Sequence, residues 1–489
     1  KPVGSGKASP TGKPVGSGKA SPTGKPVGSG KASPTGKPVG SGKASPTGKP
    51  AGKHSARAAM QRSKASPVPH GAAPPIGASH PVSSPPVNPP APAEGGAAVP
   101  PPALKLHSYA GICEKGHHED EPNKPNQDAV IMAEHPQSDA VLLGVMDGHG
   151  QDGHEVSSLL AEMLPDFVFQ HEVFLDAVAE FSAATRAAVD DELPLEGTRD
   201  ADALPPAYAA ACHALSGVLA EAIEVAEQEM MQHEEYALEV SGSTVVLALV
   251  LRDLVVVANV GDSRCSVVSG GQGGEGGVGA PLTVTHVTQD HKPNLPSETK
   301  RILLAGGCVR AITYDDGEDG PVRVWASTSA DLPGLAMSRS VCDLLGKTCG
   351  VVSTPDSVFL RLRQPMRALL LASDGLWEFM PSAAVGGILG KTHKAALVQV
   401  ADDASAARRG VGDDELLRAV LPDALMQGDL AVAVGGNADL QQQLQQRVDE
   451  THLQLAIDAL ANEAVQRWVQ TEGVIDDVSI VLAVVGNGD

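Results

Sequence analysis

Short runs of consecutive apolar residues, bounded by Gly, Asp and Asn, recur from residue 104 onward. Such runs are typical of buried strands, and they lie at residues 128–133, 141–146, 245–251, 254–260, 368–372 and 478–485. Apolar residues that return every three or four positions predict helices instead, and this spacing occurs at residues 154–164, 207–232, 297–305 and 453–469. The pattern therefore predicts buried sheets combined with helices.

The first 103 residues show neither pattern. The unit KPVGSGKASPTG fills residues 1–48 in four unchanged copies, and residues 1–103 hold 22 of the 38 prolines and no aromatic residue. Because such a segment lacks the apolar surface that offsets ordering entropy, we predict a disordered tail at 1–103 and a folded domain at 104–489. The tail holds 13 Lys and Arg residues against one acid, Glu94, so the net charge of −22 divides into +12 for the tail and −34 for the domain.

Two segments of the domain have the composition of surface insertions. Residues 190–206 are rich in Asp, Glu and Pro, and residues 401–447 are rich in Asp, Ala, Gly and Gln. A short helix near residues 414–420 is one option within the second segment. The repeats are either a duplicated spacer or a docking segment for an acidic partner, and their Ser-Pro pairs would permit phosphorylation to change their charge.

The six cysteines are scattered without a CxxC pair, which favours a reduced, intracellular setting in the cytoplasm or nucleus. No stretch approaches the roughly 18 uninterrupted apolar residues of a membrane-spanning helix, and the start of the chain has no secretory signal pattern. We therefore expect a soluble protein without a membrane partner. The missing initiator Met suggests that the sequence begins inside a longer gene product.

Several apolar runs end in, or lie next to, an aspartate. The four residues placed in this way are Asp147, Asp262, Asp374 and Asp476. A single one would be read as a turn residue or helix cap, but four ionised carboxylates at the ends of buried strands are costly unless they bind cations. Carboxylates without a Cys or His cluster favour Mg²⁺ or Mn²⁺ over Zn²⁺. Gly148 adds a backbone carbonyl that an ion could approach closely.

Two divalent ions about 3.5 to 4 Å apart lower the pKa of a bridging water and clamp a tetrahedral oxyanion. Phosphoester hydrolysis is the reaction that fits this arrangement best. His149 directly follows Asp147 and Gly148, where an imidazole could protonate a leaving alkoxide. Its alternative role is a hydrogen bond to a metal ligand.

An ordered set of motifs between about residues 109 and 485 resembles the metal-dependent type 2C protein serine/threonine phosphatases. The motifs are NQDA at 126–129, VMDGHG at 145–150, SGSTVV at 241–246, ANVGDSR at 258–264, DHKP at 290–293, ETKRILLAGG at 298–307, GLAMSRSVCD at 334–343, LLLASDGLWEFM at 369–380 and DDVSIVL at 476–482. The resemblance implies an α+β fold in which two packed, mainly antiparallel β-sheets are flanked by α-helices on both faces. It also implies a monomer that hydrolyses phosphoserine and phosphothreonine in phosphoprotein substrates.

The resemblance also assigns roles within the site. Two ions, Mg²⁺ or Mn²⁺, are expected, with a weaker third ion in some members. Asp147 would bridge both ions, the Gly148 carbonyl would bind one of them, and His149 would be the general acid. The remaining expected ligands, direct or through water, are Asp343, Asp374 and Asp476, with Asp262 and Asp343 at the third ion and Asp128 as a metal-water acid.

Three positions depart from the family pattern. Cys342 stands before Asp343 where the family usually has Gly, and Asp477 stands where the family has Asn. The position at which many members carry a phosphate-binding Arg is Asn123, so we predict that the neighbouring Lys124 contacts phosphate instead. Lys provides a point charge without the bidentate geometry of Arg.

These departures leave one alternative from a different class, a weak or inactive pseudophosphatase that binds phosphoproteins. A metal-dependent nuclease is disfavoured because the domain carries −34 and has no basic, aromatic-interleaved groove. None of the departures removes a core ligand, so we predict an active enzyme. The basic tail could fold back on the acidic domain or recruit an acidic partner.

Overall fold

The computed structural model describes residues 104–118, 122–184, 196–270, 279–313, 319–330, 332–408 and 438–487. The predicted tail at 1–103 and the optional helix near residues 414–420 lie outside these ranges, so their predictions stay open.

The first sheet has five strands in the order β1-β15-β14-β7-β8, and every neighbouring pair is antiparallel. Its strands are β1 (Leu104–Glu114), β15 (Val478–Asn487), β14 (Met366–Ala372), β7 (Arg264–Ser269) and β8 (Thr283–His286). The second sheet has the order β12-β4-β3-β5-β6-β13, with β2 paired to β3. Its strands are β2 (Asp128–Glu134), β3 (Ala140–His149), β4 (Gly242–Ser243), β5 (Val245–Leu251), β6 (Leu254–Val260), β12 (Val341–Cys342) and β13 (Asp356–Arg361).

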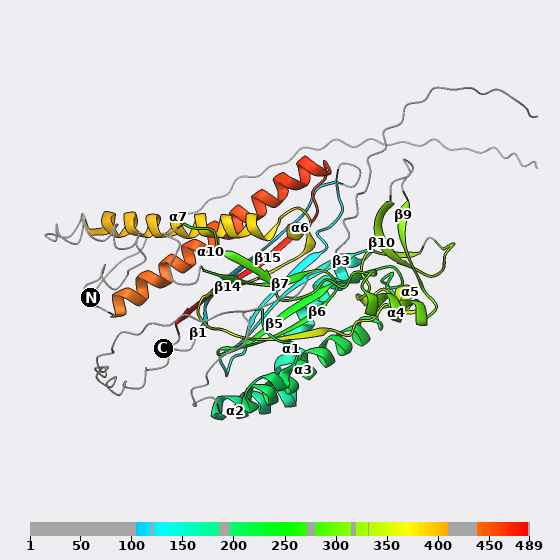
Figure 1. Cartoon of the computed structure of the whole chain (residues 1–489), viewed down its shortest axis with the longest axis horizontal. Helices are drawn as coiled ribbons and strands as arrows, with labels where there is room; N and C mark the ends of the chain where they lie inside the picture. Colours follow the sequence, from blue (N-terminus) through cyan, green and yellow to red (C-terminus); the bar gives the residue numbers. More distant parts are fainter. Residues whose placement is uncertain are drawn as a thin grey trace, which may run out of the picture. The chain divides into compact units, whose positions relative to one another are not determined.

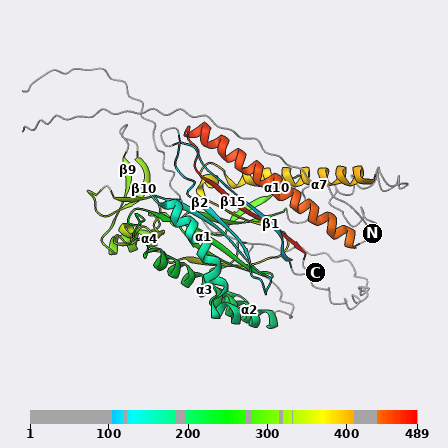
Figure 2. The same cartoon turned by 180° about the vertical axis from the view of Figure 1, so that it is seen from behind.

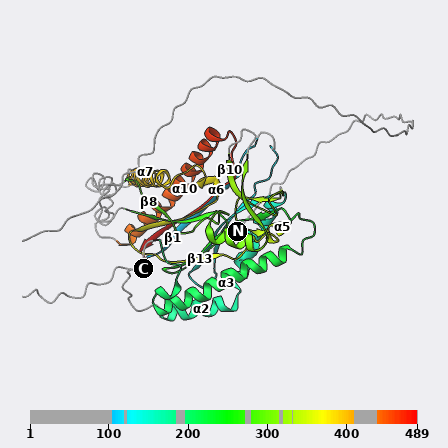
Figure 3. The same ribbon diagram turned by 45° about the vertical axis from the view of Figure 1, so that its right-hand side comes forward.

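Helices cover the outer face of each sheet (Figures 1 and 2). The second sheet is covered by α1 (Gly153–Phe169), α2 (Glu172–Ala184) and α3 (Pro206–Met230), with the short η1 (Ala201–Ala203) before α3. The first sheet is covered by α6 (Asp374–Trp377), α7 (Ser382–Arg408) and α10 (Ala438–Thr471). Figure 3 shows the two helical layers on opposite sides of the strands.

A small third sheet lies beside the sandwich in Figure 1, in the order β11-β10-β9. It consists of β9 (Cys308–Thr313), β10 (Asp319–Trp325) and β11 (Pro333–Leu335), with α4 (Pro296–Leu304) and α5 (Leu344–Lys347) next to it. A separate apolar cluster that includes Ile302, Val324 and Val351 holds this unit together.

Alternation along the strands explains the layers. In β5, Leu247 and Leu249 pack with the core of α1 to α3, whereas Val246 and Ala248 pack between the two sheets. The same division occurs over residues 368–372 of β14, where Leu369 and Leu371 face the other sheet and the even-numbered residues face α7 and α10. Because both faces of each sheet are covered, the strands are apolar on both sides, and this is why they appear in the sequence as uninterrupted runs.

The two predicted insertions are described only in part. Within 190–206, Thr198 forms an antiparallel bridge with Phe359 of β13, and the rest leads through η1 into α3. Within 401–447, α7 continues to Arg408 and α10 begins at Ala438. Residues 190–195 and 409–437 lie outside the described ranges.

Helix α3 is the one helix of the described part that is long and apolar enough to cross a membrane. Its most apolar window is 50% buried in the fold, and residues such as Leu215, Leu219 and Ile223 belong to the core that it shares with the second sheet. These contacts make α3 a core helix of the domain.

Candidate functional site

Five aspartates converge where strands of both sheets end. Asp128 begins β2 and pairs in register with Asp147 near the end of β3. Asp374 follows β14, Asp476 precedes the antiparallel neighbour β15, and Asp262 follows β6. We call these five residues the carboxylate cluster. Asp128 and Asp262 are buried, whereas Asp147, Asp374 and Asp476 are half-buried. The cluster is therefore buried on one side and accessible to solvent on the other.

The negative charges of the cluster repel one another when no cation is present. Loss of hydration raises the pKa of Asp147 well above its ordinary value, and the charges of the other four acids, Asp374, Asp128, Asp476 and Asp262, raise it further. Each carboxylate thus disfavours ionisation of its neighbours. A site of this kind gains free energy by binding positive charge.

The pKa of two other members moves to near neutrality. Burial raises the pKa of Asp128 to about 8, against a hydrogen bond from Ser373 that lowers it. Burial together with the charges of Asp262 and Asp476 raises the pKa of Asp374 to about 7. The Ser373 hydroxyl donates to Asp128 Oδ2 at 2.8 Å and accepts from the Ser479 backbone N–H at 3.1 Å, so it fixes the position of the Asp128 carboxyl.

Two lysines supply positive charge to the cluster. The charge of Lys124 works to lower the pKa of Asp476 against burial, which raises it, so the predicted phosphate contact lies beside a predicted metal ligand. Lys292 Nζ forms an ion pair with Asp262 Oδ2. Lys292 belongs to the DHKP motif, but the sequence alone predicted no role for it.

His149 lies against Asp343. Its Nε2 is 2.6 Å from Asp343 Oδ2, and Asp343 is only 1% exposed. Burial works to lower the pKa of His149, but the charge and hydrogen bond of Asp343, with Asp262 and Asp374, raise it above its ordinary value. The contact with Asp343 therefore favours the protonated form of the imidazole.

Gly148 has no room for a side chain. A Cβ atom at this position would lie 2.3 Å from the Gly153 carbonyl oxygen and 2.5 Å from that of Gln127. The absence of a side chain lets neighbouring backbone segments close around the turn after Asp147.

Asp477 adds negative charge beside the site: together with burial, its charge raises the pKa of Asp128 and of Asp476. Its Oδ1 accepts the Gly116 N–H at 2.7 Å, and its Oδ2 accepts the Gln127 N–H at 2.8 Å. The carboxylate at this departure from the family pattern therefore ties the segment before Asp128 to the start of β15. Asn123, the other departure, is exposed.

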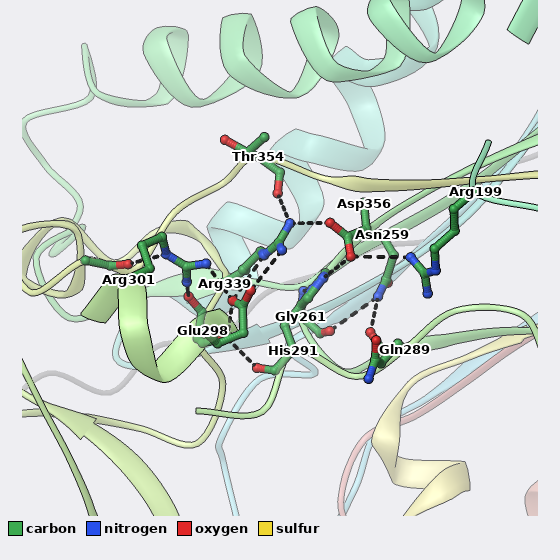
Figure 4. Close-up of polar contacts among 12 residues, drawn as sticks. Arg199, Asn259, Gly261, Gln289, His291, Glu298, Arg301, Arg339, Thr354 and Asp356 are labelled. Atoms are coloured by element: carbon green, nitrogen blue, oxygen red, sulfur yellow. Dashed lines mark hydrogen bonds and ion pairs between the residues drawn. The ribbon is translucent and has the colours of Figure 1, made fainter. Parts of the chain in front are cut away.

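A second polar network joins Glu298, Arg339 and Asp356 (Figure 4). Glu298 of α4, 2% exposed, accepts from Arg339 Nη2 at 2.9 Å and from Ser338 Oγ at 2.7 Å, and pairs with Arg301 Nη1 at 2.7 Å. Burial works to raise the pKa of Glu298, but these three partners lower it to about 2. The network ties α4 to the segment that leads to Asp343.

Asp356 extends this network toward Asp262 (Figure 4). Its Oδ1 accepts from Arg339 Nη1 at 2.7 Å, and its Oδ2 lies 3.4 Å from His291 Nε2. The other ring nitrogen of His291 accepts the Gly261 N–H at 3.0 Å. His291 thereby connects the turn before Asp262 to the segment that carries Lys292.

The residues present fit hard divalent cations. The cluster offers oxygen ligands, and Asp262 Oδ1 and Asp343 Oδ1 are buried without a hydrogen-bond partner in the described part of the chain. Over the same ranges, no three His, Cys, Asp or Glu side chains form a ready-made metal cage. Ions that keep several waters and bind a backbone carbonyl do not need such a cage.

Comparison with known proteins agrees with this geometry. The family model described as Protein phosphatase 2C matches residues 113–409, more than half of the chain. A rice protein (Oryza sativa subsp. japonica) named "Probable protein phosphatase 2C 48" is 34% identical over 279 residues, which cover 55% of this chain and 69% of the rice protein. An Arabidopsis thaliana protein named "Probable protein phosphatase 2C 6" is 33% identical over 266 residues, which cover 52% of this chain and 51% of that protein. The chain thus spans about half the length of the second relative.

The fold has a solved counterpart. The crystal structure of a serine-threonine phosphatase 2C from Toxoplasma gondii superimposes with a TM-score of 0.50 at 19% sequence identity, over 79% of this chain and 98% of that chain. The predicted fold class is therefore confirmed, and so is the predicted enzyme class. The chain belongs to the protein phosphatase 2C family of protein serine/threonine phosphatases.

Proposed function

We propose that this protein hydrolyses phosphoserine and phosphothreonine in proteins, in a reaction that depends on Mg²⁺ or Mn²⁺. The observation that carries the proposal is the carboxylate cluster, in which four acids raise the pKa of Asp147. Family membership supports a metal-dependent protein phosphatase in general, and the carboxylate cluster identifies the residues that we propose as metal ligands.

The ions would be held by Asp147, the Gly148 carbonyl, Asp374 and Asp476, with Asp128 acting through water. When bound, they supply a water of lowered pKa and positive charge for the phosphoryl oxygens. A weaker third ion at Asp262 and Asp343 would compete with Lys292, which pairs with Asp262.

The side chains of the protein perform the remaining tasks. Lys124 lies close enough to influence Asp476 electrostatically, so its ammonium group can orient the substrate phosphate at the edge of the cluster. His149 donates the proton that the departing serine or threonine alkoxide requires. Asp343 holds the imidazole through the 2.6 Å contact and favours its protonated form.

The test uses the full chain and a phosphothreonine peptide, with phosphate release measured in Mn²⁺ and in chelator. The informative variant is Asp147→Asn, which keeps the side-chain shape, and the matched control is Asp166→Asn, an exposed residue of α1. We expect activity that chelator and Asp147→Asn abolish and that Asp166→Asn preserves. Phosphate release that is unchanged by Asp147→Asn would refute the proposal.

The pseudophosphatase alternative predicts a different result in the same experiment. A protein of that kind would bind the phosphothreonine peptide without releasing phosphate. If the folded protein binds Mn²⁺ and peptide but shows no turnover, the alternative replaces the proposal, and the reversion variants Cys342→Gly and Asn123→Arg become informative.

We also propose an intracellular compartment for the protein and an electrostatic partner for its tail. The six cysteines are all unpaired, which supports a reducing intracellular compartment. Opposite charges on the tail and domain support an electrostatic partner for the tail, either the domain itself or an acidic protein. Deleting residues 1–103 should then change the dependence of the phosphatase rate on ionic strength, and an unchanged dependence would remove this role.

A further inference from the structure

Two consecutive residues beside the site adopt a backbone conformation that side chains disfavour. Cys342 has φ of +65° and Asp343 has φ of +48°. A non-glycine residue in the left-handed region is disfavoured about tenfold relative to ordinary conformations, so the surrounding structure must hold this turn. The usual glycine of the family, which would adopt it freely, is absent.

Glu227 of α3 provides this support. Its Oε1 accepts the Cys342 N–H at 2.7 Å, within the turn itself. The same carboxylate pairs with Lys347 Nζ at 2.7 Å and accepts from Ser353 Oγ at 2.6 Å. Lys347 also donates to the Ser340 carbonyl at 2.7 Å. One side chain of a core helix therefore joins the turn to the segment after it, and Lys347 extends this connection to Ser340 before the turn.

The turn determines where the Asp343 carboxylate lies. Strand β12, which ends at Cys342, pairs with β4, and β4 pairs with the end of β3 at Gly148 and His149. A Cβ atom on Gly242 of β4 would lie 2.2 Å from Asp343 Oδ2. The carboxylate therefore passes through a narrow gap to reach His149, and relaxation of φ at either residue of the turn would move it away.

We propose that Glu227 is a positioning residue, which holds the left-handed Cys342–Asp343 turn so that Asp343 lies against His149 and beside the metal centre. The role toward the ions rests on the proposed function, whereas the role toward the turn does not. The ion pair with Lys347 aims the Glu227 carboxylate at the Cys342 N–H. Cys342 in place of glycine makes this support necessary in the present chain.

The first test measures the turn without metal. Amide hydrogen exchange of residues 340–345 is followed in chelator for the full-length protein, Glu227→Ala and Glu227→Gln. Glu224→Ala is the matched control, because Glu224 lies one turn earlier on α3 and is exposed. We expect exchange about tenfold faster in Glu227→Ala, which loses a hydrogen bond to a charged acceptor, a smaller change in Glu227→Gln and none in the control.

The second test measures Mn²⁺ binding from the electron paramagnetic resonance signal of the free ion. Glu227→Ala should weaken binding about tenfold, and Glu227→Ala combined with Cys342→Gly should restore it to within about threefold, because glycine adopts the turn without support. A purely structural defect in α3 would lower the melting temperature and would not be repaired by glycine at position 342.

The two tests separate this inference from the proposed function. Unchanged exchange in Glu227→Ala, or weakened Mn²⁺ binding that Cys342→Gly fails to restore, would overturn the positioning role. A wild-type protein that binds Mn²⁺ but releases no phosphate would instead overturn the proposed function, and the response of the turn to Glu227→Ala would still decide the inference.

Discussion

The Nε2 atom of His149 lies 2.6 Å from Oδ2 of Asp343, although 194 positions separate the two residues along the chain. His149 comes directly after Gly148, a predicted metal ligand, and Asp343 is the second residue of the left-handed Cys342–Asp343 turn. This contact joins the end of β3 to the loop after β12, so the position of the imidazole depends on both segments.

The first prediction concerns proton donation to the leaving group. His149→Gln should lower kcat about 100-fold for a phosphothreonine peptide, because an alkoxide leaves poorly without a proton. It should lower kcat less than about tenfold for p-nitrophenyl phosphate, since nitrophenolate leaves without one. Steady-state kinetics on both substrates provide the measurement.

His171→Gln is the control for this prediction, because His171 is also partly buried and pairs with Glu221 at 3.3 Å. It should change neither rate. Equal losses on both substrates in His149→Gln would show that His149 acts on binding or folding and not on proton transfer.

The second prediction concerns Lys292. Lys292→Gln leaves Asp262 without its cation, so the melting temperature in chelator should fall by about 2 °C, for a loss of roughly 1 kcal/mol from a partly exposed pair. Excess Mn²⁺ should raise the melting temperature of the variant more than that of the wild type, because a third ion can then occupy the freed carboxylate.

Differential scanning calorimetry with and without Mn²⁺ checks this difference. Lys300→Gln is the control, since Lys300 is exposed on the neighbouring helix α4. If Mn²⁺ stabilises Lys292→Gln no more than the wild type, competition between Lys292 and a third ion is excluded.

The third prediction is a pH dependence of stability that comes from Glu298. Its pKa in the folded protein is lowered to about 2 from 4.5, so the ionised carboxylate stabilises the fold above about pH 4.5. This contribution, about 3 kcal/mol when complete, disappears as the pH falls toward 2. Glu298→Gln should therefore lower the urea midpoint at pH 7 and reduce its decline between pH 4.5 and pH 2.5.

Glu234→Gln is the comparison for this prediction, because Glu234 is exposed. Its midpoint should follow the wild type over the same pH range. An acid decline of undiminished size in Glu298→Gln would assign the loss of stability to other groups.

The strands that form uninterrupted apolar runs were predictable because both faces of each sheet are covered. The run at 245–251 coincides with β5, and 254–260 with β6. Strand β1 was missed because its sequence, LKLHSYAGICE, mixes polar and apolar residues and is only partly buried. The N-terminal half of α10 was missed because its Gln-rich residues lack a clear apolar period.

The aspartates of the site were predictable from the sequence, because a charged residue at the end of an apolar run is a local sequence signal. The roles of Lys292, Ser373 and Glu227 were not predictable, because each depends on which segment, distant in the sequence, the fold places against that side chain. Asp477 shows the same limit: its place next to Asp476 explains the negative charge that it adds to the site, whereas its two backbone donors, Gly116 and Gln127, lie 361 and 350 positions away along the chain.

The last prediction contrasts two glycines. A Cβ atom on Gly148 would lie 2.3 Å from a backbone oxygen, whereas a Cβ atom on Gly217 of α3 would meet nothing within 4 Å. Gly148→Ala should therefore lower the free energy of unfolding by about 2 kcal/mol and weaken Mn²⁺ binding. Gly217→Ala should raise the free energy of unfolding by roughly 0.8 kcal/mol, because alanine favours the helix, without changing Mn²⁺ binding. Urea unfolding and Mn²⁺ titration of both variants test the contrast, and Mn²⁺ binding by Gly148→Ala equal to that of the wild type would show that close backbone approach at Gly148 is not required for the metal centre.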